Sequence, residues 1–344
     1  MSISAQNSSD TRMIRLLEWL ESLPDFQLDT KTVRPASSDA SFRRYFRIDS
    51  RNGSYIVMDA PPDKEKLEPF IHVADIFGQS GVAVPEILAK DVGNGFLLLS
   101  DLGVATYLNE LNDESAHGLY LDAIDALIRI QSISQPDILP EYDRAVLLRE
   151  LNLFPEWYIA KHLNYQMSEK QKVELEKVFN LILANNLSQP QVYVHRDYHS
   201  RNLMCLGDKN DNPGILDFQD ALFGPITYDL VSLLRDAYIE WDEEKVLDWV
   251  IRYWEKAKKS GLPVNPDIDL FYRDFEFMGI QRHLKILGIF ARLYHRDGKE
   301  AYLNDIPLVL KYASKTAHRY NELAPLARLL DELQDKKQDV TYSF

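Results

Sequence analysis

The pattern of apolar and polar residues changes character about a hundred residues into the chain. In the first part, short apolar runs at residues 45–48 and 55–58 flank the pair Asn52-Gly53, which favours a tight hairpin turn. Two further runs, at residues 85–90 and 96–99, lie on either side of a second glycine-containing turn. The pattern therefore predicts four β-strands in this part of the chain.

Two helices are predicted among these strands. Apolar residues recur at helical spacing from Met13 to Leu23, and Pro24 follows directly as a stop signal. A second apolar face extends from Leu67 to Phe77. The first part of the chain thus combines strands with helices, as in an α+β fold.

The rest of the chain has the periodicity of helices. It extends over residues 116–185 and resumes after Tyr228, with two short apolar runs between, at residues 192–194 and 214–216. A small β-rich N-terminal lobe joined to a large, mostly helical C-terminal lobe is the fold that this order predicts. We expect the N-terminal lobe to contain residues 1–99, the hinge residues 100–103 and the C-terminal lobe residues 104–344.

Three polar residues follow the two short runs, and they carry the predicted chemistry. Asp197 and Asn202 come after residues 192–194, and Asp217 comes directly after residues 214–216. A hairpin formed by these two strands would bring Asn202 and Asp217 to one side, with Asp197 opposite. Phosphoryl transfer needs an oriented acceptor hydroxyl and metal ions on the phosphates. A carboxylate serves the first need, while amide and carboxylate oxygens suit Mg²⁺.

These residues predict a Mg²⁺- and ATP-dependent kinase of a small hydroxylated molecule. Asp197 would be the catalytic base, and Asn202 and Asp217 would bind the metal. His195 and Arg196 are expected to orient the loop by hydrogen bonds rather than to react.

The stretches VHRDYHSRNLM (residues 194–204) and ILDFQDALFGPITYDLVSLL (residues 215–234) resemble the aminoglycoside phosphotransferase family, which is related to the protein kinases. The resemblance implies a protein-kinase-like fold with two lobes, and it implies the roles given above for Asp197, Asn202 and Asp217. It further implies that Asp229 supports the catalytic loop from the start of a helix.

Four other segments resemble a narrower group, the cytoplasmic amino-sugar kinases of the cell wall. They are SSDASFRRYFRI, YIVMDAPPDKE, RELNLFPEWYIAKHL and RHLKILGIFARLYHRDGKEAYLNDIP. That resemblance implies phosphorylation of the anomeric hydroxyl of N-acetylmuramate and N-acetylglucosamine in peptidoglycan recycling.

The expected nucleotide site departs from the family pattern. Met58 stands where the family carries a lysine that pairs with the phosphates, and Arg44 is our first candidate to supply the missing charge, ahead of Arg43 and Arg47. Small residues would let main-chain N–H groups approach the phosphates. The remaining residues predicted to contact ATP, by main chain, are Ser37, Ser38, Ala40, Ser41, Ser100 and Leu102.

Recognition of the sugar is expected in the helical lobe. Trp157 could stack on a sugar face, and Arg282 or His283 could meet the carboxylate of N-acetylmuramate. Residues of these types are more often packing or surface residues than contacts for a sugar.

Composition narrows the class of partner. A formal net charge of −14 argues against nucleic acid and against an anionic membrane surface. Cys205 is the single cysteine, so no disulfide can form within the chain, and the polar first dozen residues lack the apolar core of a signal peptide. We expect a cytoplasmic protein with a small-molecule sugar substrate, and no sequence feature indicates a protein partner.

Three alternatives remain open at this point. The chain could phosphorylate another small alcohol, such as an aminoglycoside or a choline-like molecule. The absence of a lysine at Met58 suggests an inactive nucleotide-binding scaffold. The triplet His195, Asp197 and His199 suggests a metal-dependent hydrolase, although no further cluster completes such a site.

Overall fold

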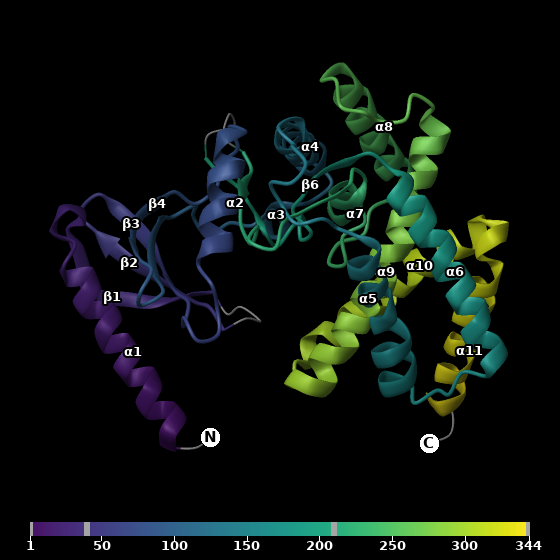
Figure 1. Cartoon of the computed structure of the whole chain (residues 1–344), viewed down its shortest axis with the longest axis horizontal. Helices are drawn as coiled ribbons and strands as arrows, with labels where there is room; N and C mark the ends of the chain where they lie inside the picture. Colours follow the sequence, from purple (N-terminus) through teal and green to yellow (C-terminus); the bar gives the residue numbers. More distant parts are fainter. Residues whose placement is uncertain (1–2, 38–41, 208–211, 342–344) are drawn as a thin grey trace. The chain divides into compact units, whose positions relative to one another are not determined.

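The computed structural model describes residues 3–37, 42–207 and 212–341, and it describes side chains over residues 11–36, 42–207 and 212–335. The chain divides into two compact units (Figure 1). The first unit contains Met1–Ala105 and Met204–Asp220, and the second contains Thr106–Leu203 and Ala221–Phe344. The first boundary lies close to the hinge expected at residues 100–103, whereas the segment 204–220 joins the first unit and was expected in the C-terminal lobe.

The first unit is built on a five-stranded antiparallel sheet. Its strand order is β1-β2-β3-β5-β4. The strands are β1 (Leu28–Ser37), β2 (Arg44–Ser50), β3 (Gly53–Asp59), β4 (Ile87–Asp91) and β5 (Phe96–Ser100). Strands β2, β3 and β5 contain the residues predicted for them, and β4 overlaps the run predicted at residues 85–90. The sequence did not predict β1, whose polar and charged residues are typical of a strand at the edge of a sheet.

One face of this sheet packs against helix α1 (Ile3–Glu21), which is followed by a short 3₁₀ turn, η1 (Pro24–Phe26). Leu16 and Leu20 of α1 form a buried cluster with Phe46, Val57 and Leu98, which lie side by side on β2, β3 and β5. Because side chains alternate across a strand, Met58 points to the opposite face.

Helix α2 (Glu68–Gln79) and the segment 204–220 complete the first unit. The segment contains β8 (Gly214–Ile215), and the Ile215 N–H donates to the Ala83 carbonyl oxygen at 2.8 Å. The Phe218 ring lies 4.8 Å from the Phe70 ring and 6.0 Å from the Phe77 ring, both on α2. These contacts anchor the residues that follow β8, including Asp217.

The hairpin expected between residues 192–194 and 214–216 is wrong. Strand β6 (Gln191–Val194) pairs with β9 (Leu222–Pro225), and β8 pairs with β7 (Leu203–Met204). Strands β7 and β9 are short and have no clear alternation of apolar and polar residues, so their pairing leaves little trace in the sequence.

The second unit is mostly helical and is organised around α9 (Ile268–Asp297). Every residue of α9 from 275 to 288 is buried, because α5, α6, α7, α10 and the π-helical segment η2 all pack on it. The remaining helices of this unit are α3 (Tyr107–Glu110), α4 (Ala116–Ser132), α5 (Arg144–Leu153), η2 (Phe154–His162), α6 (Glu169–Ser188), α7 (Tyr228–Leu234), α8 (Glu243–Lys259), η3 (Glu300–Asp305), α10 (Ile306–Arg319), η4 (Asn321–Leu323) and α11 (Ala324–Thr341).

The elements confirm the predicted α+β class, with an antiparallel sheet in the first unit and helices dominating the second (Figure 1). Within the described ranges, no helix has both the length and the apolar character needed to cross a bilayer.

Candidate active site

The loop that carries Asp197 begins at the end of β6 and is held by a buried carboxylate. The main-chain N–H groups of His195 and Arg196 donate to the two carboxylate oxygens of Asp229, at 2.6 and 3.0 Å. Asp229 is fully buried in the first turn of α7. Burial raises the pKa of Asp229 to about 7, against the opposing effect of these two N–H donors. Asp229 thus fixes the start of the loop.

Arg196 has a left-handed backbone conformation, with φ of 77°. Such a conformation is unfavourable for a residue with a side chain and persists only where neighbours hold it. Its guanidinium donates to Glu150 at 2.6 Å, and its carbonyl oxygen accepts a bond from Arg282 at 2.8 Å. Arg196, which directly precedes Asp197, is therefore held both by its side chain and by its carbonyl group.

The next residues form a compact turn closed by Asn202. The carbonyl oxygen of Asp197 accepts bonds from the His199 N–H at 3.1 Å and from the Asn202 side-chain amide at 3.0 Å. Because the Asn202 NH₂ group is directed at this carbonyl, its amide oxygen is directed away from it. The turn presents an amide oxygen five residues after the carboxylate of Asp197.

Two more anchors hold the turn. The Tyr198 hydroxyl donates to the Ala123 carbonyl oxygen at 2.8 Å, and the Ser200 N–H donates to Asp236 at 2.9 Å. Both Tyr198 and Asp236 are buried. The position of Asp197 is thus set by contacts on both sides of it along the chain.

The Asp197 carboxylate itself is accessible, with 43% of its side-chain surface exposed. Burial alone would raise its pKa, but Lys285, Arg282, His199 and Arg196 outweigh that effect and lower the pKa to about 2. Arg282 approaches it to 4.0 Å. Asp197 therefore stays ionised at neutral pH and can accept a hydrogen bond from a hydroxyl.

Behind Asp197 lies a cluster of buried charges centred on Glu150 of α5. Lys285 of α9 lies 3.0 Å from the Glu150 carboxylate and donates to the Tyr228 hydroxyl at 2.9 Å. The Tyr142 hydroxyl also donates to Glu150. Burial would raise the pKa of Glu150, but Lys285 and Arg196 hold it below its usual value. One carboxylate thus compensates two cations next to the loop.

The predicted sugar-contacting residues have different surroundings. Arg282 is buried, and one nitrogen of its guanidinium bonds to the loop carbonyl of Arg196. His283 is fully buried and stacks on Tyr312 with 5.1 Å between ring centroids. Burial lowers the pKa of His283 to about 3, so its ring is neutral. These surroundings are those of residues that support and pack the fold, and a contact of either residue with a sugar carboxylate stays a prediction. Trp157 is half-buried on η2, and its role stays a prediction.

Asp217, the second predicted metal ligand, lies in the first unit directly after β8. Its backbone is left-handed, with φ of 62°, and Gln219 donates to its carboxylate at 2.8 Å. Phe218, held against α2, restrains the same turn. A strained, anchored backbone at a carboxylate is a feature of functional loops.

The three arginines upstream of Met58 are all paired with carboxylates. Arg43 lies 3.0 Å from Glu65, Arg44 pairs with Asp59, and Arg47 lies 2.6 Å from Asp101. A phosphate contact by any of them would have to compete with its present partner.

The partner of Arg44 lies on the α1 face of the sheet. Arg44 and Asp59 are direct neighbours across β2 and β3, and Arg12 of α1 also binds the buried Asp59 carboxylate. Met58, at the expected lysine position, is buried on the opposite face. The phosphate role of Arg44 remains a prediction, and its surroundings are those of an ion pair between helix and sheet.

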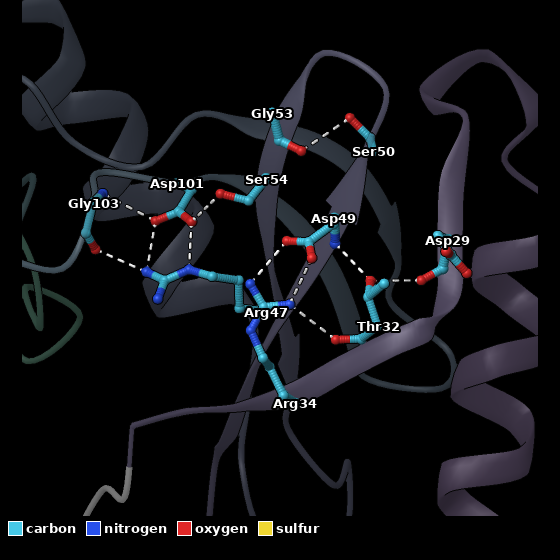
Figure 2. Close-up of polar contacts among 10 residues, drawn as sticks. All are labelled: Asp29, Thr32, Arg34, Arg47, Asp49, Ser50, Gly53, Ser54, Asp101 and Gly103. Atoms are coloured by element: carbon cyan, nitrogen blue, oxygen red, sulfur yellow. Dashed lines mark hydrogen bonds and ion pairs between the residues drawn. The ribbon is translucent and has the colours of Figure 1, made fainter.

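The predicted hinge is held in shape by a single buried carboxylate (Figure 2). Asp101 accepts bonds from the Arg47 side chain at 2.6 and 2.9 Å, from the Ser54 hydroxyl at 2.6 Å and from the Gly103 N–H at 2.9 Å. Arg47 also donates to the Gly103 carbonyl oxygen at 2.8 Å. Within the described residues, neither the N–H nor the C=O of Leu102 has a hydrogen-bond partner. The link thus presents Leu102 main-chain groups between two fixed neighbours.

The other predicted ATP contacts are divided between described and undescribed residues. Ser37 is the last residue of β1, and the Ser100 N–H donates to the Glu86 carbonyl oxygen at 3.0 Å. Ser38, Ala40 and Ser41 lie outside the described residues.

Each predicted metal ligand has an oxygen donor that suits Mg²⁺: Asn202 of the second unit has an amide oxygen, and Asp217 of the first unit has a carboxylate oxygen. Their role as ligands of one metal ion stays a prediction. His195 is fully buried, and its ring nitrogen accepts the Asp197 N–H at 3.2 Å. In the described ranges, no group of three or more His, Cys, Asp or Glu side chains is arranged to hold a metal ion. The described residues therefore give no support to the alternative of a metal-dependent hydrolase.

Sequence reasoning named Asp229, His195 and Arg196 as supports of the loop, but it did not single out Glu150 and Lys285 beside the loop or Asp101 at the hinge. Glu150 and Lys285 stand on the buried faces of α5 and α9, among leucines and isoleucines. A charged residue at a core position of an amphipathic helix is a usable signal, because such residues are buried only when paired. Asp101 and Arg47 had no comparable signal, since both occupy positions where exposed charges are common.

The class of protein follows from comparison with known sequences. The chain belongs to the phosphotransferase enzyme family, whose family model matches residues 32–262. This confirms the resemblance seen in the two motif-bearing stretches.

Two curated relatives narrow the class. A protein of Neisseria meningitidis serogroup B is 50% identical over 340 residues, covering 97% of this chain and 99% of the relative. A protein of Pseudomonas aeruginosa is 47% identical over 334 residues, covering 95% and 98%. Both are named N-acetylmuramate/N-acetylglucosamine kinase.

Solved structures support the fold. The GDP complex of aminoglycoside 2'-phosphotransferase-IIIa matches with a TM-score of 0.61 and 14% identity, covering 89% of this chain and 99% of that one. At that identity the likeness shows the fold alone, which is the kinase-like fold that the sequence predicted.

Proposed function

We propose that this chain is an ATP-dependent sugar kinase that phosphorylates the anomeric (C1) hydroxyl of N-acetylmuramate and N-acetylglucosamine. The observation that carries the proposal is Asp197, an accessible, ionised carboxylate on a loop held by Asp229, Glu150 and Arg282. The substrate class is supported by two relatives of nearly equal length, at 50% and 47% identity, that bear this name. Supply of sugar phosphates to the recycling of cell-wall precursors would be the role in the cell.

Asp197 would accept a hydrogen bond from the C1 hydroxyl and receive its proton as the oxygen attacks the γ-phosphorus of ATP. The bond between that phosphorus and the bridging oxygen breaks, and ADP leaves. A carboxylate with a pKa of about 2 is a weak base, so its main contribution is orientation. The anomeric hydroxyl is more acidic than an ordinary alcohol and therefore asks less of the base.

Asn202 and Asp217 would hold Mg²⁺, which neutralises charge on the phosphates when bound. The Leu102 main chain would meet the adenine edge. His195, Arg196 and Asp229 would keep the loop in place without touching the substrate. We also propose a cytoplasmic location, where ATP is available.

Incubation of the purified chain with Mg-ATP and a panel of sugars tests the function. We expect ADP release with both amino sugars and a sugar phosphate that is hydrolysed in mild acid, because anomeric phosphates are acid-labile. ADP release with an aminoglycoside or choline, but with neither amino sugar, would replace this function by the kinase of another alcohol. No ADP release with any acceptor would favour the inactive scaffold.

A further inference from the structure

The two proposed substrates differ in one charged group. N-acetylmuramate carries a lactyl ether on O3 whose carboxylate is absent from N-acetylglucosamine. An enzyme that uses both sugars can gain affinity for the first from a cation that has no partner in the free protein. The cations behind Asp197 do not qualify, because Arg196 and Lys285 share Glu150 and Arg282 is bonded to the loop.

Arg292 of α9 differs from these cations. Its side chain is half-buried, and its Nε is enclosed without a hydrogen-bond partner. Among the described residues, no carboxylate lies within ion-pair distance of its guanidinium. Burial and the neighbouring Arg296 lower the pKa of Arg292, while Asp297 raises it. A partly desolvated cation without a counter-charge is costly and gains from an incoming anion.

The register between α5 and α9 places Arg292 on the same side of α9 as Lys285, which contacts Glu150 of α5. The two helices lie side by side and run parallel (Figure 1): Gln281 donates to the Leu147 carbonyl oxygen at 2.9 Å, and Lys285 meets Glu150 at 3.0 Å. Further along, a Cβ at Gly288 would lie 2.4 Å from the Leu153 carbonyl group. Only glycine permits this close approach, so the register is firmly set.

Continuing this register by one turn brings Arg292 to the level of Trp157 on η2. Arg292 is seven residues past Lys285, which is about two helical turns, so both side chains leave the same face of α9. Long side chains on a helix lean toward its N-terminus, and Arg292 therefore reaches back toward Lys285 and the Asp197 loop. A sugar whose C1 hydroxyl lies at Asp197 and whose ring extends along this edge would direct its lactyl group at Arg292.

We propose that Arg292 binds the lactyl carboxylate of N-acetylmuramate and thereby sets the preference between the two amino sugars. This inference rests on the proposed function, since it concerns the acceptor of the same reaction. A charge-assisted hydrogen bond to a carboxylate is among the stronger polar contacts in a protein, and an arginine can form two in parallel.

Two other arginines near the same region are already engaged. The Arg201 guanidinium lies over the Tyr238 ring, 3.5 Å from its centroid, and 4.0 Å from Asp305. Arg296, one turn beyond Arg292, is exposed and paired with Asp297 at 2.8 Å. Arg296 is therefore a suitable control, because it lies on the same helix and carries the same charge.

The test compares both sugars in the full-length enzyme and in Arg292→Gln, Arg292→Lys and Arg296→Gln. We expect Arg292→Gln to lower kcat/KM for N-acetylmuramate about 10- to 100-fold, mainly through KM, since a hydrogen bond to a charged group is lost. The kcat/KM for N-acetylglucosamine should stay within about threefold, which also reports correct folding. Arg292→Lys should recover most of the loss, and Arg296→Gln should behave as the wild type.

Each remaining outcome counts against the inference. Equal losses for both sugars in Arg292→Gln would make Arg292 a structural residue. An unchanged KM for N-acetylmuramate would remove it from the acceptor site, and the same selective loss in Arg296→Gln would reduce the effect to general charge. A wild type that phosphorylates neither sugar would instead overturn the proposed function itself, and this inference with it.

Discussion

At the scale of single residues, the predicted catalytic carboxylate and its charge state have different origins. Asp197 is recognisable from the local pattern, because Asn202 follows five residues later. Its lowered pKa arises from Lys285 and Arg282, which lie more than eighty residues further along the chain. The local motif therefore predicts which group reacts, and packing of α9 decides in which protonation state it does so.

Replacement of Asp197 by asparagine tests the first half of this division. Asp197→Asn keeps the size of the side chain but removes its charge and its capacity to take a proton. We expect kcat to fall at least about 100-fold, in the range seen for loss of a general base, while ATP binding measured by calorimetry is retained. Turnover close to that of the wild type would remove Asp197 from its role.

Replacement of Lys285 by methionine tests the second half. Without this cation the pKa of Asp197 should rise from about 2, so the carboxylate should begin to take up a proton at a higher pH. The acid limb of the plot of kcat/KM against pH should therefore shift to higher pH. A purely structural role of Lys285 would not produce this shift. Lys256→Met, which removes an exposed cation of α8 that is paired with Asp125 of α4, is the matched control. Coincident acid limbs in Lys285→Met and the wild type would contradict the assignment.

At the scale of elements, helices and strands whose apolar residues recur at regular spacing were predicted correctly. Elements without such regular spacing were missed or wrongly paired. The helix from Met13 and the strands around Asn52-Gly53 carry apolar residues at regular spacing, and both exist. Strand β1 is largely polar because it lies at a sheet edge, and η2 is π-helical although its sequence is that of an ordinary helix. The wrong hairpin at residues 192–194 and 214–216 came from pairing short strands by proximity in sequence.

The contact between Asp101 and Arg47 at the hinge (Figure 2) can be tested by substitution. Asp101→Asn removes the charge that holds Arg47, so the main chain around Leu102 should lose its fixed shape. We expect KM for ATP to rise about tenfold while kcat changes less than about threefold, since the proposed adenine contact would contribute to binding and not to chemistry.

A control for the hinge lies on the same sheet. Asp49 pairs with Arg34 at 2.8 Å, but the two side chains are 45% and 48% exposed, against 7% for Asp101. Exposed pairs contribute little, so Asp49→Asn should leave KM for ATP unchanged. Equal effects of the two substitutions would show that charge on the sheet, rather than the hinge contact, determines nucleotide affinity.

At the scale of the whole molecule, the sequence predicted the residues expected to react more completely than the residues that hold them in place. The residues expected to react or to bind metal lie within twenty positions of one another, from Asp197 to Asp217. The groups that stabilise them come from α5, α7 and α9, so their identity depends on how distant helices pack. Pair contacts of this kind leave a signal in one sequence only where a charge interrupts an apolar face, as at Glu150 and Lys285.

Binding of the nucleotide should stabilise the whole folded chain. A ligand that binds only the folded state adds about 2.7 kcal/mol at a hundred times its Kd. The Tm of the wild type should therefore rise by several degrees with Mg-ATP, and less with ATP and a chelator. Asp217→Ala should lose the Mg²⁺-dependent part of this rise, because it removes the proposed metal ligand, whereas Asp220→Ala, which removes an exposed carboxylate three residues further on, should keep it. A Mg²⁺-dependent shift of normal size in Asp217→Ala would exclude Asp217 as the metal ligand and leave Asn202 as the sole candidate among the three motif residues.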